Sequence, residues 1–270
     1  MIRTHLVEIA ASPTGRATRL VAHMTGRGPM ALLLHGYPLD HRMWLDTLHG
    51  PLAQQRTLVA LDQRGHGDSP GSGDAAHPME LLAGDAAAVV DWLGQGPVDV
   101  VGLSMGGYVA MALWALAPQR VRSLVLANTR AGADGEAART GRDAAITTVL
   151  TKGRGPIADT MLGKLLAPGA DAAIAARVRS MIEGTPVETI VADLRGLRDR
   201  PDRVAMLPTI TVPTLVEVGA DDGITPVGEA QLLANGIRGA ELVVVPGAGH
   251  LTPMEQPAAF AAAIGAFWAR

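Results

Sequence analysis

Short apolar runs rich in β-branched residues recur along the chain and alternate with longer helical patterns. The runs are continuous rather than alternating in polarity, which is typical of strands covered on both faces of a parallel sheet. We predict strands at 31–34, 57–61, 98–103, 121–127, 214–218 and 241–245, and helices at 78–93, 105–117, 227–235 and 257–270. This alternation predicts an α/β fold with right-handed crossovers. Upstream, segments 6–9 and 19–24 flank a turn at 12–15 and predict an antiparallel hairpin at the sheet edge.

The interval 130–207 interrupts this alternation, because its patterns are helical throughout. Candidate helices lie at 139–150, 157–166, 172–182 and 187–197. We interpret the interval as a helical cap inserted over the carboxyl edge of the sheet, where open α/β folds place ligands. The core is then 1–129 and 208–270, and the alternative is an ordinary pair of packing helices. The apolar residues of the interval are aliphatic, with no aromatic side chain, so a substrate would meet a loosely packed, adaptable wall.

Composition excludes several classes of function. A chain of 270 residues can bury one sizeable core, and its formal net charge of −3 leaves no basic field for nucleic acid. The absence of cysteine excludes disulfides, thiolate catalysis and Cys-based metal sites. We find neither a signal-peptide pattern nor an apolar run long enough to span a bilayer, so we expect a cytoplasmic protein without a membrane partner.

Two segments match the G-x-S-x-G pattern, at 102–106 and 67–71. The pattern has chemical meaning only on a strained strand-to-helix turn, where small residues let the backbones approach and the next residue offers its N–H. Ser104 follows a predicted strand, opens a predicted helix and is followed by Met105. Ser69 has neither neighbour, and Pro70 has no N–H to donate. Ser104 is therefore the candidate nucleophile.

A serine nucleophile needs a general base with a pKa near neutrality, which points to a histidine. His250 ends a strand and a Gly-rich loop, so we place it at the same sheet edge as Ser104. We interpret His5, His23, His49 and His77 as surface residues. His41 could reach the pocket rim, but nothing in the sequence marks it. No two histidines share a metal-ligand spacing with carboxylates, so we expect no metal.

The acid that orients the base should follow another strand at this edge. Asp221 and Asp222 both follow the strand 214–218, and the spacing from Gly219 together with Thr225 and Pro226 favours Asp222. Asp221 remains the alternative, with capping or a turn as its own role. The chain order Ser104, Asp222, His250 is the order of one of the convergent serine triads.

Ester cleavage also needs two N–H groups to stabilise the oxyanion. Met105 supplies one, and we assign the other to Tyr37 in the loop after the 31–34 strand, because Pro38 has no N–H. We expect His35 to brace this loop. For the charged, Gly-rich loop 62–69 we expect a structural network beneath the site, with direct substrate contact as the alternative.

Five blocks of sequence carry a family resemblance. They are H-G-Y-P-L-D-x-R-M-W at 35–44, D-x-R-G-H-G-D-S at 62–69, G-L-S-M-G-G-Y-V-A at 102–110, G-A-D-D-G-I-T-P at 219–226 and P-G-A-G-H-L-T-P-M-E-Q-P at 246–257. Together they resemble the α/β-hydrolase superfamily, and more narrowly small carboxylesterases close to the 3-oxoadipate enol-lactonase branch. The resemblance implies a mostly parallel eight-stranded sheet flanked by helices, a helical lid and hydrolysis through an acyl-enzyme without a cofactor.

We therefore expect a carboxylesterase acting on small to medium esters, with Ser104, His250 and Asp222 as triad and the Tyr37 and Met105 amides as oxyanion donors. One alternative is a lactonase that opens a 3-oxoadipate enol-lactone or a similar ring, for which Arg130, Arg139 and Arg142 are candidate anion contacts. Another is a ligand receptor that keeps the site for binding. The expected partner is a small-molecule ester, and we expect a monomer or small homo-oligomer.

Overall fold

The computed structural model describes residues 1–12 and 15–270 and contains one eight-stranded sheet in the order β1-β2-β4-β3-β5-β6-β7-β8. β1 and β2 pair antiparallel, β2 and β4 pair antiparallel, and the remaining neighbours are parallel. The predicted α/β fold with a mostly parallel sheet flanked by helices is confirmed. The predicted turn at 12–15 includes residues 13 and 14, which lie outside the described residues.

The predicted strands and long helices all occur, with small shifts at their ends. The strands are β1 Arg3–Ile9, β2 Thr18–Gly26, β3 Met30–Leu34, β4 Thr57–Asp62, β5 Val98–Leu103, β6 Val121–Ala127, β7 Thr214–Gly219 and β8 Glu241–Val245. The helices are α1 Leu45–His49, α2 Met79–Leu93, α3 Met105–Leu116, α4 Glu136–Lys152, α5 Gly155–Leu165, α6 Ala172–Gly184, α7 Val187–Arg198, α8 Val227–Gly236, α9 Thr252–Glu255 and α10 Pro257–Trp268. The sequence did not indicate α1 and α9, which are too short to show a helical period.

The parallel register aligns the carboxyl ends of five neighbouring strands. Leu34 lies opposite Gly102, Leu103 opposite Ala127, Ala127 opposite Glu217, and Gly219 opposite Val245. The loops that follow β3, β5, β6, β7 and β8 therefore leave the sheet at one edge. This alignment brings segments far apart in the sequence to a single place, where open α/β sheets bind their ligands.

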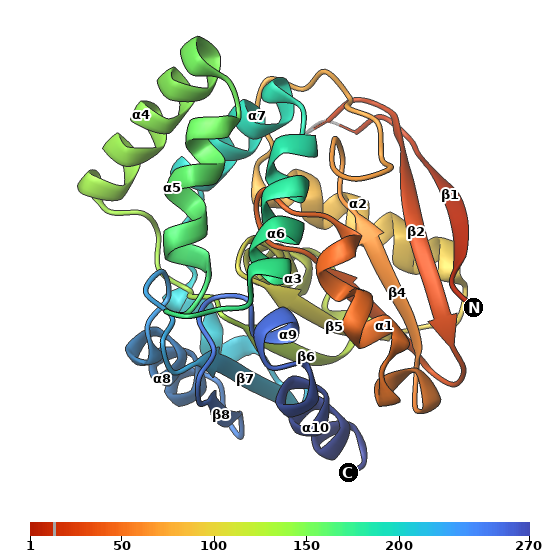
Figure 1. The fold of residues 1–270 in the computed structure, drawn as a ribbon. Helices are drawn as coiled ribbons and strands as arrows, with labels where there is room; N and C mark the ends of the chain where they lie inside the picture. Colours follow the sequence, from red (N-terminus) through yellow and green to blue (C-terminus); the bar gives the residue numbers. More distant parts are fainter. Residues whose placement is uncertain (13–14) are drawn as a thin grey trace.

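Helices cover both faces of the sheet, as Figure 1 shows, with α1, α9 and α10 in front of it and α2 and α3 behind. β4, β5 and β7 are buried along their whole length, which explains their continuous apolar sequences. α3 is the most buried helix, because it packs on β3, β5 and β6 and against α2. Within the described part of the chain, no helix is both long and apolar enough to span a membrane.

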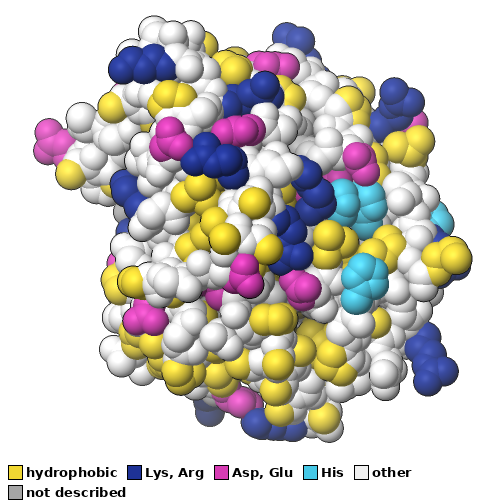
Figure 2. All heavy atoms as spheres, in the orientation of Figure 1, with side chains coloured by type: hydrophobic (Ala, Val, Ile, Leu, Met, Phe, Trp, Pro, Cys, Tyr) yellow, Lys and Arg dark blue, Asp and Glu magenta, His cyan; other side chains and the backbone are white. Residues whose placement is uncertain are grey.

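The four helices α4 to α7 lie between β6 and β7 and stand together on one side of the molecule (Figure 1). α7 is the most buried of the four, and its buried side chains include Ile190, Leu194 and Leu197. α4 is mostly exposed, and only Val149 is fully buried in it. On the face shown in Figure 2, Lys and Arg side chains lie next to Asp and Glu. Ion pairs join Arg179 to Glu183 within α6, and Arg177 of α6 to Asp46 of α1.

The close approach of two backbone segments at the β5–α3 turn predicts that a side chain at Gly106 destabilises the protein. A Cβ on Gly106 would lie 2.0 Å from the carbonyl oxygen of Leu34, whereas a Cβ on Gly84 of α2 would meet nothing within 4 Å. We expect Gly106→Ala to lower the free energy of unfolding by about 3 kcal/mol or more, because backbone cannot move aside as a side chain can. Gly84→Ala, the matched helical control, should raise it by about 0.5–1 kcal/mol. Urea unfolding followed by circular dichroism measures both, and a Gly106→Ala protein as stable as the wild type would contradict the packing argument.

Candidate active site

Ser104 lies on a strained turn between β5 and α3. Its backbone has φ 54° and ψ −113°, an uncommon conformation for a residue other than glycine. A Cβ on Gly102 would lie 2.2 Å from the carbonyl oxygen of Gly106, so the turn requires small residues on both sides of the serine. The Ser104 N–H donates to the carbonyl of Ala127 at 3.0 Å, which ties the turn to β6. The turn thus has the geometry that the sequence pattern predicts.

The other match to the serine pattern has a structural role. Ser69 is buried, its hydroxyl donates to the carbonyl of Asp62 at 2.6 Å, and it accepts from the N–H of Val21 at 2.8 Å. Both bonds hold the loop after β4 against β2, so Ser69 is engaged in loop structure.

Asp222 and His250 form a buried pair at the sheet edge. His250 Nδ1 lies 2.8 Å from Asp222 Oδ2, and both side chains are almost completely buried. Asp222 Oδ1 accepts from the backbone N–H groups of Ile224 and Thr225, and Oδ2 accepts from the Thr225 hydroxyl. Burial alone would raise the pKa of Asp222, but the His250 contact and these donors outweigh it and lower the pKa to about 2. The carboxylate is therefore ionised and can orient the imidazole.

The loop after β6 connects the serine turn to this pair. The Thr129 hydroxyl donates to the carbonyl of Ser104 at 2.9 Å. The side-chain amide of the preceding residue, Asn128, donates to Asp222 Oδ2 at 2.9 Å and to the carbonyl of Gly249 at 3.1 Å. Two consecutive residues thus hold the serine turn and the acid–base loops together.

Among the described residues, the Asp222–His250 hydrogen bond is present and a Ser104–His250 hydrogen bond is not. Catalytic hydrogen bonds of substrate-free enzymes are commonly long and tighten when substrate binds. The structure thus brings the predicted acid and base into contact and places the serine turn beside the loop that holds them. The adjacent Asp221 is exposed, and its backbone N–H donates to the carbonyl of Ala248 at 2.9 Å.

The two predicted oxyanion donors also lie at this edge. Met105 is the first residue of α3, and Tyr37 follows Gly36, on which a Cβ would lie 3.4 Å from Ser104 Cβ. Within the described part of the chain, neither the Tyr37 nor the Met105 backbone N–H has an acceptor. Both N–H groups are thus available to a ligand oxygen. His35 braces the loop, since its Nε2 accepts from the N–H of Gln63 at 3.1 Å.

A cavity of about 520 Å³ lies between the sheet edge and helices α4, α5 and α7. Two of its lining residues come from the sheet edge. Tyr37 carries one of the candidate oxyanion donors, and Ile224 belongs to the loop of Asp222. Its wall is largely aliphatic and includes Met161, as the composition of the interval predicts. The cationic side chains of Arg142 and Lys164 line it as well, and within the described residues no carboxylate does. The volume and lining are those of a small-molecule site.

The sequence reasoning was wrong about His23 and His77, which are buried and paired with aspartates rather than exposed. His77 Nδ1 lies 2.7 Å from one oxygen of Asp193 of α7, and His66 Nε2 lies 2.8 Å from the other. Burial opposes ionisation of Asp193, but the charges and hydrogen bonds of both histidines lower its pKa to about 2. The two histidines therefore anchor α7 to the loops around it.

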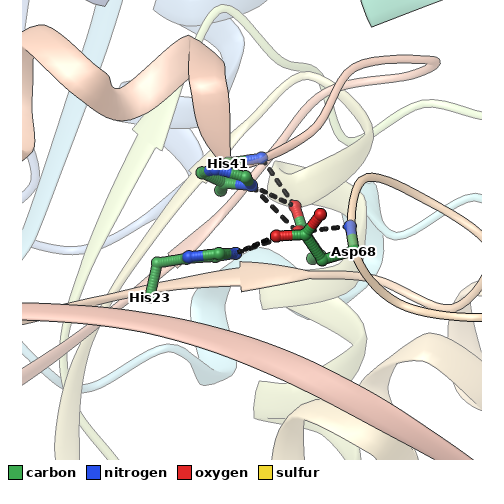
Figure 3. Close-up of side chains that lie close together, drawn as sticks. His23, His41 and Asp68 are labelled. Carbon is green, nitrogen blue, oxygen red and sulfur yellow. Dashed lines mark hydrogen bonds and ion pairs between the residues drawn. The ribbon is translucent and has the colours of Figure 1, made fainter. Parts of the chain in front are cut away.

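His23 belongs to a second cluster, with His41, Asp62 and Asp68 (Figure 3). His23 Nε2 lies 3.1 Å and His41 Nδ1 2.9 Å from Asp62 Oδ2, and Asp62 also accepts from the backbone N–H groups of His41 and Asp68. Burial would raise the pKa of Asp62, but these donors lower it far below its usual range. Sequence spacing could not reveal the cluster, because its members come from β2, β4 and two loops.

The four potential ligand atoms of this cluster lie within 4.8 Å of one another. The rings of His23 and His41, however, lie one above the other (Figure 3). Their centroids are 3.6 Å apart, and their planes make an angle of 21°. A metal ion about 2 Å from both nitrogens would have to lie between the two planes instead of along the in-plane lone pairs. The arrangement fits a hydrogen-bonded ion pair and explains how the loop after β4 is held.

Comparisons with known proteins agree with this fold. The model of the alpha/beta hydrolase family matches residues 31–263. A pimeloyl-[acyl-carrier protein] methyl ester esterase from Neisseria meningitidis is 32% identical over 242 residues, which cover 85% of this chain and 90% of that protein. The family match and this relative define the class of the protein as a hydrolase. The chain belongs to the alpha/beta hydrolase family, as the sequence blocks predicted.

Solved structures show the same likeness. A thermophilic esterase from Thermogutta terrifontis superimposes with a TM-score of 0.93 at 35% identity, covering 97% of both chains. The enol-lactonase from Burkholderia xenovorans LB400 superimposes with a TM-score of 0.86 at 26% identity, covering 94% of this chain and 97% of that one. Because the two superpositions cover 97% and 94% of this chain, each includes most of the region of α4 to α7.

The His41–Asp62 pair predicts a pH dependence of stability. The contribution of Asp62 to the free energy of unfolding is fully present above the pKa of an unfolded aspartate, about 3.9, and is lost as pH falls. Burial lowers the pKa of His41, but the contact with Asp62 outweighs burial and raises it. The contribution of His41 to the free energy of unfolding is therefore fully present below the pKa of an unfolded histidine, about 6.5, and is lost at higher pH. We expect His41→Gln to cost about 2 kcal/mol at pH 5.5 and distinctly less at pH 9.

Chemical denaturation at the two pH values measures this difference. His49→Gln is the matched control, because His49 is an exposed residue at the end of α1. An equal loss of stability for His41→Gln at both pH values would show that the charge of His41 does not hold the cluster.

Proposed function

We propose that the protein is a serine hydrolase that cleaves small to medium carboxylic esters through an acyl-enzyme, with Ser104 as nucleophile, His250 as general base and Asp222 as orienting acid. The observation that carries the proposal is the buried Asp222–His250 pair, which lies at the same sheet edge as a serine held at positive φ. The esterases among the relatives support this reaction class. Residues 130–207 would act as the cap over the site.

The hydrogen bonds determine which nitrogen of His250 does the chemistry. Nδ1 faces Asp222, so Nε2 remains to accept the proton of Ser104. Ser104 Oγ attacks the ester carbonyl carbon, and the backbone N–H groups of Tyr37 and Met105 stabilise the resulting oxyanion. The proton on Nε2 then passes to the leaving alcohol. Water attacks the acyl-enzyme by the same steps and releases the acid.

The adjacent aspartates provide a matched test of the triad. Asp222→Asn keeps the size of the side chain but removes the charge that stabilises the imidazolium, so we expect kcat to fall about 10³- to 10⁴-fold. Asp221→Asn should leave kcat within about twofold, because Asp221 is exposed. Ser104→Ala should abolish acyl-enzyme formation.

Hydrolysis of p-nitrophenyl esters of increasing chain length measures these effects, and mass spectrometry detects the acylated serine. Substantial turnover by Ser104→Ala, or equal losses in the two aspartate variants, would refute the assignment. A site that binds esters stoichiometrically without turnover would instead indicate the receptor alternative.

The cavity lining favours one second candidate, a lactonase acting on an anionic ring. Lys164 and Arg142, whose guanidinium is also paired with Asp134 at 3.1 Å, bring cationic groups to the cavity, and an enol-lactonase is among the structural neighbours. Of the other two arginines that the sequence suggested, Arg139 donates to the carbonyl of Asp134 and does not line the cavity, and Arg130 is half-buried near Asp134.

A variant of Arg142 can therefore distinguish a neutral from an anionic substrate. For a lactone or ester with a free carboxylate, we expect Arg142→Gln to raise KM about tenfold, as the loss of one charge-assisted contact implies. Arg139→Gln, one turn earlier on α4, should have no such effect. Steady-state kinetics with matched neutral and carboxylated substrates measure the difference. Equal changes in KM for the two substrates would exclude recognition of the anion by Arg142.

A further inference from the structure

Glu217 is a buried glutamate that the reaction described above does not use. It lies in β7, in an otherwise apolar strand, and its side chain is completely buried. Its Oε2 lies 2.8 Å from the hydroxyl oxygen of Thr252, while Oε1 has no hydrogen-bond partner within the described structure. Burying an ionised carboxylate is unfavourable in free energy when one of its oxygens receives no hydrogen bond. The protonation state of Glu217 therefore needs an explanation.

Counting hydrogens along the neighbouring contacts determines that state. Asn128 uses both hydrogens of its amide, one toward Asp222 Oδ2 and one toward the carbonyl of Gly249. The reversed amide would turn its oxygen toward two acceptors, so Asn128 Oδ1 must face Thr252. The Thr252 hydroxyl lies 2.8 Å from that oxygen, which can only accept.

Thr252 has a single hydroxyl hydrogen, and Asn128 Oδ1 requires it. The contact between Thr252 Oγ1 and Glu217 Oε2 is then a hydrogen bond only if Glu217 donates. A carboxylate cannot donate, whereas a carboxylic acid can. The hydrogens along this path are all accounted for when Glu217 is neutral.

We propose that Glu217 is a positioning residue that acts, as a neutral carboxylic acid, through Thr252 and Asn128 on the carboxylate of Asp222. The path runs from Glu217 to Thr252, from Thr252 to Asn128 Oδ1, and from the Asn128 amide to Asp222 Oδ2, the same oxygen that contacts His250 Nδ1. The Asn128 backbone has φ 45°, a left-handed conformation that asparagine tolerates better than most residues. The inference rests on the proposed function.

The surroundings of Glu217 favour the neutral form. Burial raises the pKa of Glu217 to about 8, with a further rise from the negative charge of Asp222 and a partial offset from Thr252. The other ionisable groups on the loop after β8 and on α9 are His250, paired with Asp222, and Glu255, whose carboxylate accepts from the backbone N–H groups of Ala167, Gly249 and Leu251. Among the residues that the structure describes, no Lys, Arg or His side chain forms an ion pair with Glu217 that would stabilise its ionised form.

Loss of the Glu217 proton to solvent should disturb the site. The Thr252 hydroxyl would turn its hydrogen to the new carboxylate, and Asn128 Oδ1 would then face a lone pair at 2.8 Å. The amide would lose its fixed orientation toward Asp222, and a second negative charge would arise near the triad acid. We expect kcat for a neutral ester to fall about five- to tenfold through an alkaline step centred near pH 8, as the weakening of one such hydrogen bond implies.

The kinetic test compares variants across the pH range. Glu217→Gln keeps a donor for Thr252 but cannot ionise, so it should retain activity at pH 7 and lose the alkaline step. Thr252→Val should lower kcat about tenfold at all pH values, and Thr252→Ser should restore both the rate and the step. Glu241→Gln, an exchange of the same type on β8, should keep the wild-type profile. An alkaline step of unchanged size and midpoint in Glu217→Gln would overturn the coupling to Asp222.

An infrared measurement tests the protonation state without using activity. The wild type at pH 7 should show the carbonyl stretch of a buried carboxylic acid, which disappears above pH 9 and is missing at pH 7 in Glu217→Gln. Absence of this band at pH 7 would overturn the proposal even in an active enzyme. If Ser104→Ala refutes the proposed reaction, the band still decides whether Glu217 is neutral, so the two failures are distinguishable.

Discussion

The parallel alignment of β3, β5, β6, β7 and β8 is the constraint on which the rest of this molecule depends. Because these strands end at one edge, the loops carrying Tyr37, Ser104, Asn128, Asp222 and His250 meet although they span most of the chain. The alignment in turn requires the backbones at the β5–α3 turn to approach closely, which only small residues at positions 102 and 106 permit. The geometry of the candidate site is thus a consequence of strand register and of two positions without a Cβ.

Buried carboxyl groups around this edge differ in charge because they differ in donors. Asp222 and Asp193 receive histidine contacts, and Asp222 receives several further donors, so both are ionised despite burial. Glu217 has one contact, to a hydroxyl whose hydrogen is already used, so burial dominates and favours its neutral form. Buried carboxyl groups thus anchor a helix, contact the candidate base or, as we propose for Glu217, donate as a neutral acid, according to the hydrogens that neighbouring segments supply. The contacts that stabilise the fold thus also set which carboxyl groups near the candidate site are charged.

Much of the architecture could be predicted because its signals are local. Continuous apolar runs indicated the central strands, and helical periods indicated the helices between β6 and β7, to within a few residues. The predicted acid and base are in contact, while the roles of Ser104 and of the oxyanion donors stay predictions. The pairing of His23 with Asp62 and of His77 with Asp193 was not predictable, because the partners lie in loops and strands that no spacing rule connects. The short helices α1 and α9 were not predicted, because they contain too few residues to show a helical period in hydrophobicity.

By itself, the sequence determined the elements, their order and the type of residue at each strand end, because periodicity, glycine and proline act within a few neighbouring residues. Only the tertiary structure decided which buried polar groups meet, which of them carry charge and what lines the cavity. His66 and His77 reach Asp193 across 127 and 116 residues, and Thr252 reaches Asn128 across 124. Such contacts depend on the register of the whole sheet and on the burial it creates, and neither property is contained in any short stretch of chain.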